Sequence, residues 1–110
     1  MTKYRYVLNE KYKKNHTNSF YCIGAMGHAN QIGLELSLQK KKKNIYILDG
    51  DGAALMHMGN LSTIANYKPK NLIHILLDNN VHDSTGQQLT NATNVEFANV
   101  AINCGYKQSY

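Results

Sequence analysis

The sequence predicts an α/β fold with a doubly wound parallel sheet. Short apolar runs at residues 19–23, 44–48 and 72–77 alternate with segments of helical periodicity, and this alternation is typical of βαβ units with right-handed crossovers. Each apolar run stops abruptly at glycines or at oxygen-bearing side chains, as expected where a buried parallel strand reaches its carboxyl end. We therefore expect ligands to bind beyond the carboxyl ends of these strands.

The chain begins with a polar segment. Residues 1–18 are rich in Lys, Tyr and Asn and have no clean period. We expect them to form a disordered leader or the remains of a preceding element, followed by one domain over residues 19–110. Residues 19–23 predict the first strand, which ends in a glycine turn at 24–27. Beyond the turn, residues 28–38 predict a helix of about three turns.

The flanking residues decide the assignment of this helix, because the even spacing of apolar residues from Ile32 to Leu38 is also compatible with a strand. Gly27 and Asn30 supply start signals, and the lysine run 40–43 supplies a basic C-terminus that suits the helix dipole. The later elements are expected in the order strand 44–48, helix 55–65, strand 72–77, loop 81–93, helix 95–102 ended by Gly105, and a further strand from residue 106.

Length and composition limit the chain to one domain. It has 110 residues, of which 43% are hydrophobic, enough for a single modest core. No apolar run reaches the ~18 residues of a membrane span, and the N-terminus lacks the apolar region of a secretory signal, so we expect a soluble cytoplasmic protein. Cys22 and Cys104 belong to no CxxC spacing, which favours two buried free thiols over a disulfide or a metal site.

The positive charge argues against a nucleic-acid partner. The formal net charge is +5, and the positive charge is concentrated in Lys11, Lys13 and Lys14 and in the lysine run 40–43. That run has no interleaved aromatic residue, and Arg5 is the one arginine of the chain. Nucleic-acid-binding proteins favour arginine for base edges and aromatic residues for stacking. A solvated connector between a helix and a strand is therefore the preferred interpretation of the lysine run.

Two polar strand ends predict a site for a phosphate and a hard cation. Gly50 and Gly52 allow the backbone to turn and to approach a ligand closely. Asp51 would repel a phosphate unless a divalent cation lay between them, and Mg²⁺ prefers oxygen ligands such as Asp51 and the amide oxygen of Asn79. A glycine-rich turn with Asp51 as a helix cap remains the alternative at this point.

The spacing of these two motifs resembles the thiamine diphosphate motif of the pyruvate decarboxylase and acetolactate synthase superfamily. Three longer segments, 24–33 (GAMGHANQIG), 48–59 (LDGDGAALMHMG) and 82–86 (HDSTG), resemble the C-terminal, cofactor-binding half of the phosphonopyruvate decarboxylases. The sulfopyruvate decarboxylase beta subunits are a close alternative. The resemblance runs over residues 19–110 and implies the diphosphate-domain fold of these enzymes, truncated at its C-terminus.

The resemblance assigns roles to the matching residues. It implies that Mg²⁺ is held by the side chains of Asp51 and Asn79 and by the carbonyl of Val81. It also implies that thiamine diphosphate is bound by Gly24, Met26, Gly50, Asp51, Gly52, Ala53 and Asn79. Met26 would lie under the bent cofactor, although core packing is the alternative for this residue. The residues proposed to contact the substrate are His28, His82, Ser84 and Thr85, whereas His57 and His74 lie in apolar patterns typical of core histidines.

The family resemblance implies an activity that this chain does not complete alone. It implies decarboxylation of a 2-oxo acid, namely phosphonopyruvate to phosphonoacetaldehyde and carbon dioxide, or else of sulfopyruvate. The activating glutamate belongs to a separate pyrimidine-binding domain, and no segment of this chain resembles that domain. We therefore expect an inactive part of a homo- or hetero-oligomeric enzyme, with a non-catalytic cofactor-binding remnant as the alternative.

Overall fold

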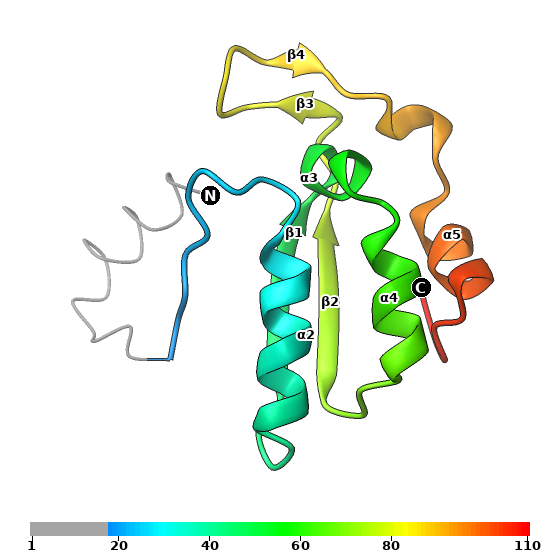
Figure 1. The fold of residues 1–110 in the computed structure, drawn as a ribbon. Coiled ribbons are helices and arrows are strands. Elements are labelled where there is room, and N and C mark those ends of the chain that lie inside the picture. The colour runs from blue at the N-terminus through cyan, green and yellow to red at the C-terminus, as the bar shows by residue number, and fades with distance from the viewer. Residues whose placement is uncertain (1–17) are drawn as a thin grey trace.

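The computed structural model describes residues 18–110, so the predicted leader lies outside this range apart from its last residue. Figure 1 shows a short parallel sheet with helices beside it and a two-stranded ribbon beyond one end. The elements are α2 (Ala29–Gln39), β1 (Ile45–Gly50), α3 (Asp51–Met56), α4 (Asn60–Tyr67), β2 (Leu72–Leu77), β3 (Val81–His82), β4 (Gln88–Leu89), the 3-10 helix η1 (Ala92–Asn94) and α5 (Phe97–Cys104).

Strands β1 and β2 run parallel, which confirms the predicted type of sheet. Ile45 lies opposite Leu72, and Gly50 lies opposite Leu77. The two strands therefore end side by side, and the polar residues that follow them emerge at the same edge. This edge is where open α/β sheets bind ligands.

Helix α2 packs on one face of the sheet, against both β1 and β2, and helix α4 contacts α2. In α2 the buried residues are Asn30, Gly33, Leu34 and Ser37, a spacing that places them on one face of a helix. Gly33 allows close packing, because a Cβ atom there would lie 2.5 Å from Cγ1 of Ile47. The buried apolar core consists of Leu34, Ile47, Ala54, Leu61, Ile64, Ala65, Ala92 and Ala101.

The opposite face of the sheet is exposed within the described part of the chain. Alternate residues of the two strands project from it, and their side chains are 38–60% exposed: Tyr46, Leu48, Ile73, Ile75 and Leu77. A doubly wound sheet has helices on both faces. Within the described residues, the sheet is therefore covered on one face only, which is consistent with the incomplete domain that the sequence predicts.

Several predicted boundaries require correction. Residues 19–23 do not form a strand: Phe20 is 73% exposed and Ile23 70% exposed, and the segment pairs with neither β1 nor β2. Residues 106–110 likewise contain no strand. Apolar, β-favouring composition does not form a strand without a neighbour for the backbone hydrogen bonds. Asn30 is not a cap either, because it lies inside α2, whose N-cap residue is His28.

The predicted helix 55–65 is in fact two helices. Helix α3 begins at Asp51, directly after β1, and the chain turns at residues 57–59 before α4 begins at Asn60. Helix α4 ends at Tyr67. The next residue, Lys68, has a φ of +47° and precedes the proline that prevents the helix from continuing. Helix α5 ends at Gly105 as predicted, with a φ of +105°.

The predicted loop 81–93 contains regular structure. Strands β3 and β4 form an antiparallel ribbon in which Val81 lies opposite Leu89. The ribbon folds back over the sheet edge at which β1 and β2 end (Figure 1). No helix within residues 18–110 has the length and apolar character needed to cross a membrane.

Candidate cofactor-binding site

A cavity of about 880 Å³ lies beyond the carboxyl ends of β1 and β2. Four segments contribute most of its lining, namely residues 21–27, 48–53, 76–79 and 81–84. The predicted site residues among them are Gly24, Met26, Gly50, Asp51, Gly52, Ala53, Asn79, Val81, His82 and Ser84. The two other predicted residues, His28 and Thr85, do not line this cavity. The fold thus gathers both motifs and the glycine turn around one space.

Asp49 and Asp51 are the most buried acidic residues at the cavity. Each side chain is 2% exposed. Asp51 follows β1 directly and begins α3. Oδ2 of its carboxylate accepts a hydrogen bond of 2.5 Å from the hydroxyl of Thr90. Sequence reasoning missed Thr90, because a single threonine in a polar segment carries no distinguishing pattern.

The chain turns sharply after β2. The amide oxygen of Asn79 accepts a hydrogen bond of 3.2 Å from the N–H of Val81, and the carboxylate of Asp78 accepts one of 3.1 Å from the N–H of Asn80. Asn80 has a φ of +60°, a left-handed conformation that asparagine tolerates better than most residues. Asn79 and Val81, on either side of Asn80, both line the cavity.

The glycines of the first motif differ in their surroundings. No heavy atom lies within 4 Å of a Cβ atom built on Gly50, so open space borders its backbone. At Gly52, by contrast, a Cβ atom would lie 2.6 Å from Cε1 of His82 and 3.2 Å from Cε of Met26. His82 and Met26 therefore approach the backbone of the motif from two different segments, as closely as only a glycine permits.

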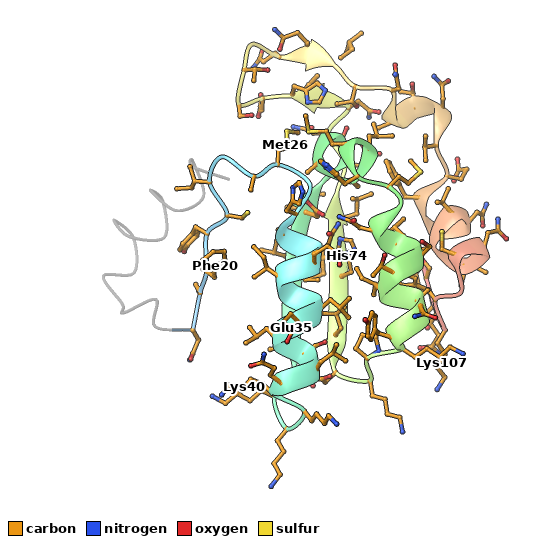
Figure 2. All side chains as sticks on the ribbon, viewed as in Figure 1. Phe20, Met26, Glu35, Lys40, His74 and Lys107 are labelled. Atoms are coloured by element: carbon orange, nitrogen blue, oxygen red, sulfur yellow. The ribbon has the colours of Figure 1, made fainter. Side chains whose placement is uncertain are left out.

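The lining of the cavity is acidic. Four aspartates contribute to it, and neither lysine nor arginine does so among residues 18–110: Asp49, Asp51, Asp78 and Asp83. The lysine run begins at Lys40, at the opposite end of the molecule from Met26 (Figure 2). The exposed run is thus a connector, as predicted, and its charge lies far from the cavity.

A buried network of polar side chains lies next to the cavity. Nδ2 of Asn30 lies 3.3 Å from Oδ2 of Asp49, and Nδ2 of Asn60 donates to Oδ1 of Asn30 at 2.9 Å and to the carbonyl of Gly27 at 3.0 Å. The sequence pattern did not reveal this network, because its members are far apart along the chain and Asn30 was interpreted as a helix start signal. It links the glycine turn to the ends of α2, α4 and β1.

His74 lies next to this network and connects it to Tyr106 near the C-terminus. Its Nε2 lies 3.4 Å from Oδ2 of Asp49 without hydrogen-bond geometry, and its Nδ1 lies 3.5 Å from the hydroxyl of Tyr106. Burial, together with smaller contributions from the nearby Cys104 and Asp49, raises the pKa of Tyr106 to about 12. Tyr106 is therefore a neutral phenol at physiological pH.

The remaining predicted residues lie near the cavity without lining it. His28 is exposed, and its ring lies 4.2 Å from that of His57, centroid to centroid. The hydroxyl of Thr85 makes hydrogen bonds within its own turn, to the carbonyl of His82 at 3.2 Å and to Oε1 of Gln88 at 2.7 Å. Cys22 and Cys104 are free thiols, and each is half-buried where full burial was predicted.

The donor set at the cavity suits a hard cation. Asp51, Asn79 and Val81 line the cavity and offer a carboxylate, a side-chain amide oxygen and a backbone carbonyl. Oxygen donors of this kind are preferred by Mg²⁺ and Ca²⁺. The open space at Gly50 leaves room for a ligand beside the motif. The residues present therefore fit a ligand that contains a phosphate and a divalent cation.

Comparison with known proteins agrees with this geometry. Residues 1–109 match the C-terminal thiamine pyrophosphate-binding domain of thiamine pyrophosphate enzymes. The chain belongs to this family. The cofactor of the family is thus thiamine pyrophosphate, which is also called thiamine diphosphate. The match confirms the predicted family resemblance and the predicted fold class.

Named relatives of this thiamine pyrophosphate-binding domain are decarboxylases. It is 48% identical over 88 residues to a phosphonopyruvate decarboxylase of Streptomyces hygroscopicus, a match that covers 80% of this chain and 22% of the relative. It is 42% identical over 95 residues to the sulfopyruvate decarboxylase beta subunit of Methanocaldococcus jannaschii, covering 86% of this chain and 50% of the relative. The chain therefore spans half or less of the length of these curated relatives.

Proposed function

We propose that this domain holds the diphosphate and cation of Mg²⁺-thiamine diphosphate in a 2-oxo acid decarboxylase, with phosphonopyruvate as the preferred substrate. The observation that carries the proposal is the convergence of Asp51, Asn79 and Val81 on one cavity at the carboxyl ends of β1 and β2. The first two would bind Mg²⁺ through side-chain oxygens, and Val81 through its carbonyl.

The acidic lining supports the need for a cation. A diphosphate is strongly anionic, and four aspartates line the cavity without a lysine or arginine among the described residues to offset them. Like charges in a site of low dielectric repel each other strongly. A divalent cation between Asp51 and the diphosphate would remove this repulsion. Gly52 and Ala53 lie in the first turn of α3, where backbone N–H groups have no acceptor within the helix, and their N–H groups would bind the diphosphate.

Residues of the glycine turn would orient the rest of the cofactor. Gly24 and Met26 line the same cavity. The Gly24 carbonyl would accept a hydrogen bond from the aminopyrimidine, and Met26 would supply an apolar contact for the cofactor. When bound, thiamine diphosphate supplies the electron sink that decarboxylation of a 2-oxo acid requires. His82 and Ser84 line the cavity, so we prefer them to His28 and Thr85 as contacts for the anionic substrate.

A second polypeptide or domain would complete the site. No glutamate of residues 18–110 lines the cavity, and Glu35 points away from it on the outer side of α2 (Figure 2). We therefore propose that a pyrimidine-binding partner supplies the activating glutamate. The printed name of the Methanocaldococcus jannaschii relative is that of a beta subunit, which supports a partner chain and makes sulfopyruvate the alternative substrate.

The proposal is tested by combining this chain with a pyrimidine-binding subunit of the phosphonopyruvate or sulfopyruvate type. Release of carbon dioxide is measured with each substrate, with thiamine diphosphate and Mg²⁺ present. We expect turnover of phosphonopyruvate by the mixture and by neither chain alone. Turnover of sulfopyruvate only would identify the alternative substrate, and cofactor binding without turnover in any mixture would favour a non-catalytic role.

A further inference from the structure

Thr90 connects the two strand ends that border the cavity. Its hydroxyl donates a hydrogen bond of 2.5 Å to Oδ2 of Asp51, and its backbone N–H donates one of 2.9 Å to the carbonyl of Asn80. The hydroxyl oxygen also accepts a hydrogen bond of 3.3 Å from the N–H of Ala92. Thr90 is 7% exposed and does not line the cavity. It therefore contacts Asp51 from the protein interior.

The antiparallel ribbon explains how Thr90 reaches this position. Val81 pairs with Leu89, so the residue after Leu89 falls opposite the residue before Val81. The hydrogen bond from Thr90 to Asn80 continues that pairing by one step. Thr90 thus bonds both to the segment that follows β2 and to the Asp51 carboxylate that follows β1.

The hydroxyl of Thr90 restricts the Asp51 carboxylate. This side chain is 2% exposed, and among residues 18–110 the hydrogen bond that it accepts comes from Thr90. Hydrogen bonds to an ionised acceptor are roughly twice as strong as neutral ones. Because Oδ2 is held by this hydrogen bond, rotation of the carboxylate is disfavoured.

We propose that Thr90 is a positioning residue for cation binding, which orients the Asp51 carboxylate and fixes residues 79–81 beside it. The inference rests on the proposed function, because it concerns the same cation. Groups that orient metal ligands in this way typically contribute about 10- to 100-fold to metal affinity. Thr90 would act without touching the cation or the cofactor.

The test measures Mn²⁺ binding by the full chain in the presence of thiamine diphosphate, with free Mn²⁺ determined by electron paramagnetic resonance. Thr90→Val keeps the shape of the side chain and removes the hydroxyl, whereas Thr90→Ser keeps the hydroxyl. Ser37→Ala is the matched control, because Ser37 is a buried hydroxyl that bonds within α2, to the carbonyl of Leu34. Circular dichroism establishes that each variant is folded, and Thr90→Ala replaces Thr90→Val if valine disturbs the fold.

We expect the dissociation constant for Mn²⁺ to rise about ten-fold or more in Thr90→Val. Thr90→Ser and Ser37→Ala should remain close to the unmodified chain.

Two results would overturn the inference, and only the second would also overturn the proposed function. If the unmodified chain binds Mn²⁺ and Asp51→Asn does not, while Thr90→Val binds as tightly as the unmodified chain, Thr90 has no positioning role and the proposed function stands. If the folded, unmodified chain binds no Mn²⁺ with thiamine diphosphate, the proposed function fails and the role of Thr90 fails with it.

Discussion

The side-chain amide of Asn30 lies 3.3 Å from the carboxylate of Asp49, and both side chains are almost completely buried. This contact joins the first turn of α2 to the end of β1, one residue before the glycine–aspartate motif. Asn60 adds a link from Asn30 to the carbonyl of Gly27. The backbone segments that border the cavity are therefore held by side-chain hydrogen bonds as well as by the sheet.

Replacing Asn30 by leucine should destabilise the fold. The change leaves the Asp49 carboxylate and one amide hydrogen of Asn60 without their partner, and an unsatisfied buried polar group costs about 1–3 kcal/mol. We expect the free energy of unfolding in urea to fall by about 2 kcal/mol or more. Gln39→Ala removes an exposed amide from the same helix and should change stability by less than about 0.5 kcal/mol. Equal effects of the two changes would contradict the role of the network.

Replacing Gly33 by alanine should also destabilise the fold. The added Cβ atom would lie 2.5 Å from Cγ1 and 2.7 Å from Cδ1 of Ile47, and overpacking of this kind costs about 1–3 kcal/mol. Alanine recovers up to about 1 kcal/mol through its higher helix propensity, so we expect a smaller net loss. Gly59→Ala is the matched control, because no atom lies within 4 Å of the added Cβ. A Gly33→Ala chain as stable as the control would show that α2 shifts away from β1 at little cost.

The two glycines of the motif should respond differently to alanine. Gly50 borders open space, so Gly50→Ala should leave the free energy of unfolding almost unchanged and weaken thiamine diphosphate binding by occupying ligand space. At Gly52 the added Cβ would meet the His82 ring, so Gly52→Ala should displace this half-buried ring and affect both stability and binding. Urea unfolding and cofactor titration measure the two properties separately. Unchanged cofactor binding by Gly50→Ala would show that the ligand does not occupy the space beside Gly50.

Tyr106 should make the fold less stable in alkaline solution. Burial raises its pKa from the ordinary value of 10.0 to about 12, so the folded chain keeps the phenolic proton over a range in which the unfolded chain has lost it. The unfolded state then binds fewer protons, and stability must fall as pH rises between these two values. Tyr106→Phe removes this contribution. We expect the unmodified chain to lose more unfolding free energy than Tyr106→Phe from pH 10 to pH 12, whereas parallel curves would contradict the burial of this phenol.

Much of the sheet could be predicted from the sequence. The apolar runs of β1 and β2 are bounded by polar residues, and their parallel pairing follows from the helix between them. The glycines and the acid of the first motif and Asn79 were placed at one sheet edge correctly, because parallel strands end together. These features depend on local patterns that the chain carries within each segment.

Other features depend on contacts between distant residues. Residues 19–23 have strand composition and no strand partner, and the break between α3 and α4 follows no proline. Thr90, Asn30 and Asp49 act through partners that lie 19 or 39 positions away along the chain. Hydrogen bonds over such separations are fixed by tertiary packing, which single-sequence patterns do not reveal.

Calorimetric titration of thiamine diphosphate into the chain tests the central claim most directly. The titration is made with and without Mg²⁺, for the unmodified chain and for Asp51→Asn, which keeps the shape of the side chain and removes its charge. The account predicts binding that requires Mg²⁺ and is lost in Asp51→Asn, because the carboxylate holds the cation between itself and the diphosphate. Absence of Mg²⁺-dependent heat in the folded, unmodified chain, or equal binding by Asp51→Asn, would contradict it.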